Sequence, residues 1–95
     1  MSEPSTGKFH AVVQIVNPRG LHARAAAKFV RALEAFDAEV KVARDGMEVD
    51  GNSIMGLMML GAAQRSHLSI RAEGPDGKAA LAAVVALVED GFGEM

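Results

Sequence analysis

The chain contains the run Asn17-Pro18-Arg19-Gly20-Leu21-His22-Ala23-Arg24-Ala25-Ala26-Ala27-Lys28-Phe29-Val30. Its Asn, Pro and Gly predict a turn, and the alanine-rich part predicts a helix whose first turn holds His22. The start of a helix normally favours acidic side chains, because aligned peptide dipoles leave partial positive charge there. Here the charged residues are all basic: Arg19, Arg24 and Lys28. This pattern favours an anion site beside a nucleophilic imidazole, which suggests a histidine that takes up a phosphoryl group as one interpretation of the run.

Four segments alternate apolar and polar residues, which is typical of strands with one buried face. They span residues 9–15, 39–42, 47–50 and 67–73. Asp45-Gly46 predicts a hairpin between the second and third segments. The alternation directs Met47 and Val49 inward. It directs His10 and His67 outward, where we expect solvated side chains without a role.

Three segments have helical periodicity. The first spans residues 22–36, the second residues 54–60, and the third residues 78–90. Ser53 is the expected N-cap of the short second helix, because its hydroxyl can accept a backbone N–H. Gly61 and Gly91 are the expected stops of the second and third helices. The apolar face of the first helix consists of Ala26, Phe29, Val30, Leu33 and Phe36, and that of the third of Leu81, Val84, Val85 and Val88.

The predicted element order is βαββαβα. Each strand has only one apolar face, which predicts a four-stranded antiparallel sheet that is wet on one side and covered by three helices on the other. The expected class is therefore α+β, an open-faced sandwich. The length of 95 residues leaves room for one domain, which we expect over residues 9–95 after a flexible extension at residues 1–8.

Composition narrows the classes of function. The net charge of −2 gives no reason to expect nucleic acid as a partner. The chain lacks cysteine and a recognisable signal peptide, and its longest apolar stretch, near residues 79–88, is too short to span a bilayer. We expect a cytoplasmic protein with no membrane partner. Three scattered histidines do not form a set of metal ligands, so we expect neither a metal nor a cofactor.

The chemistry of His22 has two interpretations. A neutral imidazole with one exposed ring nitrogen, close to the free N–H groups of a helix start and to Arg24, is suited to accept a phosphoryl group. Gly20 would let the turn approach closely. The other interpretation is that His22 is an ordinary polar surface residue or a partner of the helix cap, and residue spacing alone does not choose between them.

The chain resembles the HPr family, the histidine phosphocarriers of bacterial phosphotransferase systems, over about residues 9–92. Gly20-Leu21-His22-Ala23-Arg24 is similar to the phosphorylation loop of that family. Asn52-Ser53-Ile54-Met55-Gly56-Leu57-Met58-Met59-Leu60 is similar to its regulatory-serine helix. Phe36-Asp37-Ala38-Glu39-Val40 and the C-terminal stretch of residues 74–92 look like the nitrogen-related branch, NPr.

The resemblance implies roles for several residues. His22 would take a phosphoryl group on its delta nitrogen from the phosphohistidine of an enzyme I-type protein, which draws it from phosphoenolpyruvate, and would pass it to an enzyme IIA-type acceptor. Arg24 matches the arginine that assists the phosphate. Ala25 stands where the family usually has proline, which we expect to change the rigidity of the loop slightly without loss of activity.

The resemblance also implies control and binding surfaces. Ser53 matches the serine that a dedicated HPr kinase/phosphorylase modifies in many bacteria, although it also suits an unmodified N-cap. The helix after it is apolar nearly all round, and we expect Leu57 and Leu60 in the core. The expected partner-binding residues are Arg19, Ala23, Ala27, Lys28, Ile54, Met55 and Met58.

The leading interpretation is thus a phosphocarrier that is reversibly phosphorylated at His22. Such a protein transfers a phosphoryl group between partner proteins and is not a complete enzyme with turnover on a small substrate. The alternative is a protein-binding regulator that uses the same face, with a histidine that serves recognition only. A small ligand-binding or metal-carrying domain ranks below both. We expect the free protein to be a monomer.

Overall fold

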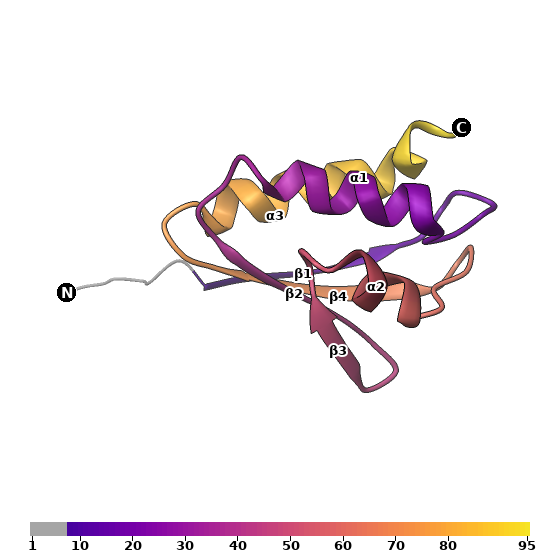
Figure 1. Ribbon diagram of the computed structural model, residues 1–95, viewed down its shortest axis with the longest axis horizontal. Coiled ribbons are helices and arrows are strands. Elements are labelled where there is room, and N and C mark those ends of the chain that lie inside the picture. Colours follow the sequence, from indigo (N-terminus) through magenta and orange to yellow (C-terminus); the bar gives the residue numbers. More distant parts are fainter. Residues whose placement is uncertain (1–7) are drawn as a thin grey trace.

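The computed structural model describes residues 8–95, whose elements follow the predicted order (Figure 1). Residues 1–7 of the predicted extension lie outside the described residues, and Lys8, its last predicted residue, is the first residue of β1. The elements are β1 (Lys8–Gln14), α1 (Ala23–Leu33), β2 (Glu39–Arg44), β3 (Met47–Asp50), α2 (Ile54–Met59), β4 (His67–Glu73), α3 (Gly77–Glu89) and a 3-10 turn (Gly91–Gly93).

The strands form one antiparallel sheet in the order β1-β4-β2-β3, which confirms the open-faced sandwich. In Figure 1 the sheet is seen nearly edge-on, with α1 and α3 side by side over one face. The inward residues of β4 are Leu68, Ile70 and Ala72, all fully buried. They pack in one core with Phe29 of α1 and with Val84 of α3. Burial of this apolar face, rather than helix propensity, holds the helices on the sheet.

The first helix is shorter than predicted at both ends. Extended backbone at His22 makes this residue the N-cap and not part of the first turn, which corrects its predicted place. At the other end the helix stops at Leu33 instead of Phe36. The amide of Phe36 bonds to the carbonyl of Leu33, a tighter turn that redirects the chain into β2.

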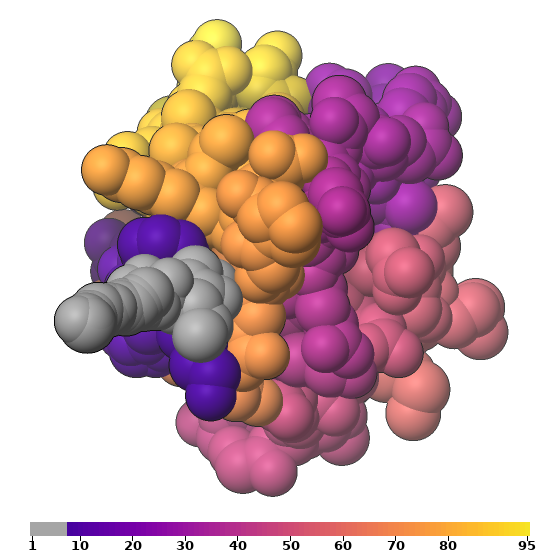
Figure 2. Space-filling model, turned by 90° about the vertical axis from the view of Figure 1, so that its left-hand side faces the viewer, coloured from indigo at the N-terminus to yellow at the C-terminus, as the bar shows by residue number. Residues whose placement is uncertain are grey.

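The chain is redirected there by contacts with the loop before α3. The amide of Asp37 donates to Oδ2 of Asp76 at 2.7 Å, and the amide of Asp76 donates to the carbonyl of Asp37 at 3.0 Å. Figure 2 views this end of the molecule, where the orange segment near residue 76 lies against the magenta segment near residue 37. The contact fixes the end of the sandwich opposite to the His22 loop.

The prediction that Met47 faces inward is wrong. Met47 is 44% exposed, and Val49 is the one half-buried residue of β3. The reason lies in the sheet order: β3 is an edge strand that pairs with β2 alone, beyond the cover of α1 and α3. Alternating residues predict which side chains share a face of the strand, but they do not predict whether a helix covers that face.

The wet face of the sheet carries a contact that the sequence did not indicate. His10 is exposed as predicted, but its Nε2 lies 2.6 Å from Oγ of Ser69 on the neighbouring β4, so it is not a freely solvated side chain. His67 is exposed. No helix among residues 8–95 has the length and apolar character needed to cross a membrane.

Candidate functional site

The loop between β1 and α1 is held rigidly by buried contacts. Asn17 is fully buried, and its Nδ2 donates to the carbonyl of Gly20 at 2.8 Å. Gly20 has a φ of +67° and its amide bonds back to the carbonyl of Asn17, while the amide of Leu21 donates to the carbonyl of Ala62 at 2.9 Å. A Cβ at Gly20 would lie 2.4 Å from that carbonyl oxygen, so only glycine fits. The loop therefore delivers His22 to a defined position.

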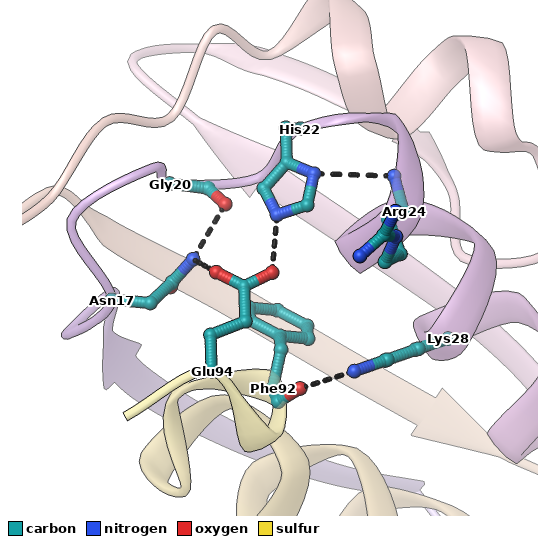
Figure 3. Close-up of polar contacts among 7 residues, drawn as sticks. All are labelled: Asn17, Gly20, His22, Arg24, Lys28, Phe92 and Glu94. Atoms are coloured by element: carbon teal, nitrogen blue, oxygen red, sulfur yellow. Dashed lines mark hydrogen bonds and ion pairs between the residues drawn. The ribbon is translucent and has the colours of Figure 1, made fainter.

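His22 caps α1 with its own imidazole (Figure 3). Nδ1 accepts the backbone N–H of Arg24 at 3.2 Å, which satisfies one of the donors that a helix start leaves free. The ring is mostly buried, with 16% of its side chain exposed. The first turn of α1 contains no acidic residue. One ring nitrogen of a partly exposed histidine thus faces the N–H groups and the positive end of a helix, the arrangement that favours an anion.

Basic side chains gather around this helix start. Arg19 and Arg24 are both exposed. Figure 3 draws the backbone nitrogen of Arg24 bonded to the imidazole of His22 and no interaction from the guanidinium of Arg24 to the other residues shown. Lys28, which the sequence predicts as a partner-binding residue, also has a contact within the fold, because its Nζ donates to the carbonyl of Phe92 at 2.6 Å.

Glu94, after the 3-10 turn, completes the site, and no sequence pattern predicts this contact. Glu94 accepts at both carboxylate oxygens: Oε1 from Nδ2 of Asn17 at 2.9 Å, and Oε2 from Nε2 of His22. In Figure 3 its carboxylate lies between these two side chains. The only available signal was the Gly-Phe-Gly sequence after α3, which indicates an unusual turn but not where it leads.

The environment of Glu94 stabilises its charged form. Burial alone would raise the pKa of the Glu94 carboxyl, but hydrogen bonds from His22 and Asn17 and the positive charge of Arg19 lower this pKa below its ordinary value. The carboxylate is therefore ionised at neutral pH. An ionised carboxylate beside Nε2 of His22 can accept a hydrogen bond from an N–H at that ring nitrogen.

Ser53 and the apolar residues of α2 lie where the pattern predicts. Oγ of Ser53 accepts the amide of Gly56 at 3.0 Å, so this serine is an N-cap. Leu57 and Leu60 are buried. The outer face of α2, which packs beside α1, exposes Ile54 (40%), Met55 (70%), Met58 (40%) and Met59 (66%). The last of these is an addition to the predicted surface.

Potential metal ligands are dispersed. Within residues 8–95 no group of three or more His, Asp or Glu side chains is arranged to hold a metal ion. The polar groups at the start of α1 are the imidazole of His22, the exposed guanidinium groups of Arg19 and Arg24, and backbone N–H groups.

Comparison with known proteins agrees with this geometry. The family model described as the PTS HPr component phosphorylation site matches residues 9–90. The chain belongs to the HPr family. It is 45% identical over 80 residues to phosphocarrier protein HPr of Cupriavidus necator, with 84% of this chain and 90% of that protein covered. It is 43% identical over 83 residues to phosphocarrier protein NPr of Escherichia coli K12, with 86% and 92% covered.

A solved structure extends the likeness to the fold. The crystal structure of HPr-C-His from Thermoanaerobacter tengcongensis superimposes with a TM-score of 0.87 at 40% identity, and covers 92% of this chain and 98% of that one. Membership of the HPr family establishes a phosphocarrier role in the phosphotransferase system, and it implies enzyme I and enzyme IIA partners. Glu94 lies beyond the residues that the HPr family model matches.

Proposed function

We propose that His22 accepts a phosphoryl group at Nδ1 from the phosphohistidine of an enzyme I-type donor, supplied ultimately by phosphoenolpyruvate, and passes it to an enzyme IIA-type acceptor. The observation that carries this proposal is the place of Nδ1 at the open start of α1, 3.2 Å from the amide nitrogen of Arg24. The lone pair on Nδ1 forms the bond to phosphorus while the bond between phosphorus and the donor's ring nitrogen breaks. The return step to an acceptor is the reverse.

The groups around Nδ1 suit the phosphoryl oxygens. The backbone N–H of Arg24, released from Nδ1 when the ring is phosphorylated, can donate to a phosphoryl oxygen. The exposed guanidinium groups of Arg24 and Arg19 can add charge-assisted hydrogen bonds. The start of α1 can therefore stabilise the negatively charged phosphoryl group on His22.

The partner surface in this proposal joins α1 and α2. Its basic part comprises Arg19 and Arg24, and its apolar part comprises Ala23, Ala27, Ile54, Met55 and Met58. Methionine side chains adapt to different partners, and a basic rim attracts acidic ones. The rate of phosphorylation by the donor should fall as ionic strength rises. A rate that is independent of salt would exclude electrostatic steering by this surface.

The proposal places the carrier in a regulatory, nitrogen-type system because residues 36–40 and 74–92 look like NPr, and NPr of Escherichia coli is among its relatives at 43% identity. Control through Ser53 is part of the same proposal. Phosphorylation of Ser53 by an HPr kinase/phosphorylase would add a charge of about −1.5 to −2 next to the exposed Ile54 and repel an acidic partner. Incubation with the kinase of the host and ATP tests this, and absence of phosphate from Ser53 would remove this control from the account.

The experiment that tests the proposed function is phosphorylation by phosphoenolpyruvate and an enzyme I-type protein. Wild type and His67→Ala should acquire an acid-labile, alkali-stable phosphate, whereas His22→Ala should acquire none. His67 is a matched control because it is also a histidine and lies exposed on β4. Equal labelling of all three proteins would overturn the assignment to His22.

A protein-binding regulator that uses the same face is the alternative function. It predicts binding to the donor without transfer, and failure of several matched donors to label wild type would favour it. In either case we propose a monomer. Sedimentation at micromolar concentration should give the mass of one chain, about 9.9 kDa, and a dimer would contradict this part.

A further inference from the structure

The imidazole of His22 is held between two groups of opposite hydrogen-bonding sense. Nδ1 meets the backbone N–H of Arg24, which can only donate. Nε2 meets the carboxylate of Glu94, which, when ionised, can only accept. A neutral ring satisfies both when its proton is on Nε2 and its lone pair on Nδ1. The two contacts therefore select one tautomer.

Asn17 determines how the carboxylate of Glu94 is oriented toward His22. The carbonyl of Gly20 accepts only, so the amide of Asn17 must turn its Nδ2 toward it. The same Nδ2 donates to Oε1 of Glu94 at 2.9 Å, and Asn17 is fully buried. The amide cannot reverse without setting its oxygen against that of Gly20. In this orientation Asn17 presents an N–H to residue 94, while its Oδ1 is buried without a hydrogen-bond partner among the described residues.

The backbone after α3 is shaped to bring Glu94 to the ring. Three consecutive residues have left-handed conformations: Gly91 (φ +65°), Phe92 (φ +57°) and Gly93 (φ +73°). Such a conformation is costly for Phe92, and its fully buried ring and the bond from Lys28 to its carbonyl hold it there. The turn folds the end of the chain back onto the start of α1 (Figure 3).

We propose that Glu94 is a positioning residue that keeps the proton of His22 on Nε2 and so leaves Nδ1 as the nucleophilic nitrogen, with Asn17 orienting the carboxylate. The proposal rests on the proposed function for its consequence in phosphoryl transfer. When Nδ1 donates its electron pair to phosphorus, the ring becomes positively charged, and Glu94 faces that charge through the retained Nε2–H. When the bond between Nδ1 and phosphorus breaks, the electron pair returns to Nδ1 and the proton stays where it was.

Glu94→Gln is a sharp test because the contact with Asn17 would set a second N–H donor, the new amide, against the N–H donor at Nε2 of His22. The new carbonyl oxygen must face Nδ2 of Asn17, so the new NH2 group faces Nε2 of His22. The ring should then move its proton to Nδ1, which masks the nucleophilic lone pair. Glu94→Ala removes the carboxylate without placing a donor on Nε2, so its tautomer shift should be smaller.

The measurement is the 15N chemical shift pattern of the His22 ring in the unphosphorylated protein, with the rate of phosphorylation measured in parallel. We expect the Nε2–H tautomer in wild type and in Glu89→Gln, a matched change at an exposed residue of α3. We expect the Nδ1–H tautomer to gain population in Glu94→Gln, with a transfer rate lower by roughly tenfold or more; loss of the corresponding carboxylate in a serine protease triad costs about 10⁴. Glu94→Ala should lie between the two.

The order of the variants separates positioning from a merely structural role. If Glu94 only holds the chain end, Glu94→Ala should be the slower variant because it loses both hydrogen bonds. An unchanged tautomer in Glu94→Gln, or a slower Glu94→Ala, would overturn the proposal. If no donor labels wild type, the proposed function fails, but the tautomer measurement still decides the role of Glu94.

Discussion

The ammonium group of Lys28, in the second turn of α1, donates a hydrogen bond of 2.6 Å to the main-chain carbonyl of Phe92. This contact joins residues that are 64 positions apart and ties α1, the helix that His22 caps, to the turn that precedes Glu94. The sequence predicts Lys28 as one of the basic residues that bind a partner. In the structure it also braces the C-terminal turn.

Lys28→Met should loosen that turn. We expect the free energy of unfolding to fall by about 1–2 kcal/mol, because a charged donor to a carbonyl is lost. For a domain of this size, each kcal/mol of lost stability lowers Tm by roughly 4–8 °C. The amide of Glu94, which bonds to the carbonyl of Gly91, should exchange faster with solvent. Lys78→Met, at an exposed position of α3, is the control and should change stability by less than about 0.5 kcal/mol. Equal effects of the two changes would show that the Lys28 contact is not formed in solution.

Gly20→Ala and Gly46→Ala form a second matched pair. Both glycines have positive φ, +67° and +84° respectively, so both variants carry backbone strain of roughly 1–2 kcal/mol. Nothing lies within 4 Å of a Cβ at Gly46, whereas a Cβ at Gly20 lies 2.4 Å from the carbonyl oxygen of Ala62. Denaturant unfolding should show a loss at Gly20 that exceeds that at Gly46 by about 1–3 kcal/mol. Similar losses would contradict the close approach of the His22 loop to Ala62.

Ser53 can be tested by two substitutions that separate capping from charge. Ser53→Ala should cost about 1 kcal/mol, because the amide of Gly56 loses its acceptor, and should leave phosphoryl transfer largely intact. Ser53→Asp keeps a cap and should cost less, but its negative charge should slow transfer from the donor. Thermal unfolding and the transfer assay measure the two effects. Slower transfer in Ser53→Ala than in Ser53→Asp would argue against a charge effect.

The lowered pKa of Glu94 predicts a pH-dependent term in stability. A carboxyl group whose pKa is lower in the folded protein stabilises the fold above the pKa of the unfolded chain, about 4.3 for Glu, and loses this contribution as the pH falls through the folded pKa. The Tm difference between wild type and Glu94→Gln should therefore be largest near neutral pH and shrink below about pH 4. Glu89→Gln should show no such trend, and a constant difference for Glu94→Gln would contradict the lowered pKa.

The sequence predicted the architecture well because alternation and helical periodicity record which face of each element is buried. The inward positions of β4, Leu68, Ile70 and Ala72, are all in the core. Met47 was predicted inward and lies exposed, because the pattern within an edge strand does not tell how far the helical layer extends. The wrong limits of α1 have a similar cause, since the cap at His22 and the tight turn at Phe36 depend on hydrogen bonds that periodicity does not encode.

At the site, the sequence pattern of residues 17–30 predicted His22 and Arg24, but no pattern predicted Glu94. Its position depends on a turn through three left-handed residues and on the burial of Phe92, both of which follow from tertiary packing. Nothing in the sequence ties residue 94 to residue 22, which lies 72 positions away. Pairings of this kind become visible only when the chain is folded.

The most direct test of the central claim is the position of the phosphorus atom. A 15N-labelled protein phosphorylated by phosphoenolpyruvate and an enzyme I-type donor can be examined by 15N and 31P NMR, which distinguish the two ring nitrogens. We predict a single phosphorus on Nδ1 of His22, with Nε2 still protonated. Phosphorus on Nε2, on another residue, or on no residue at all would contradict the account.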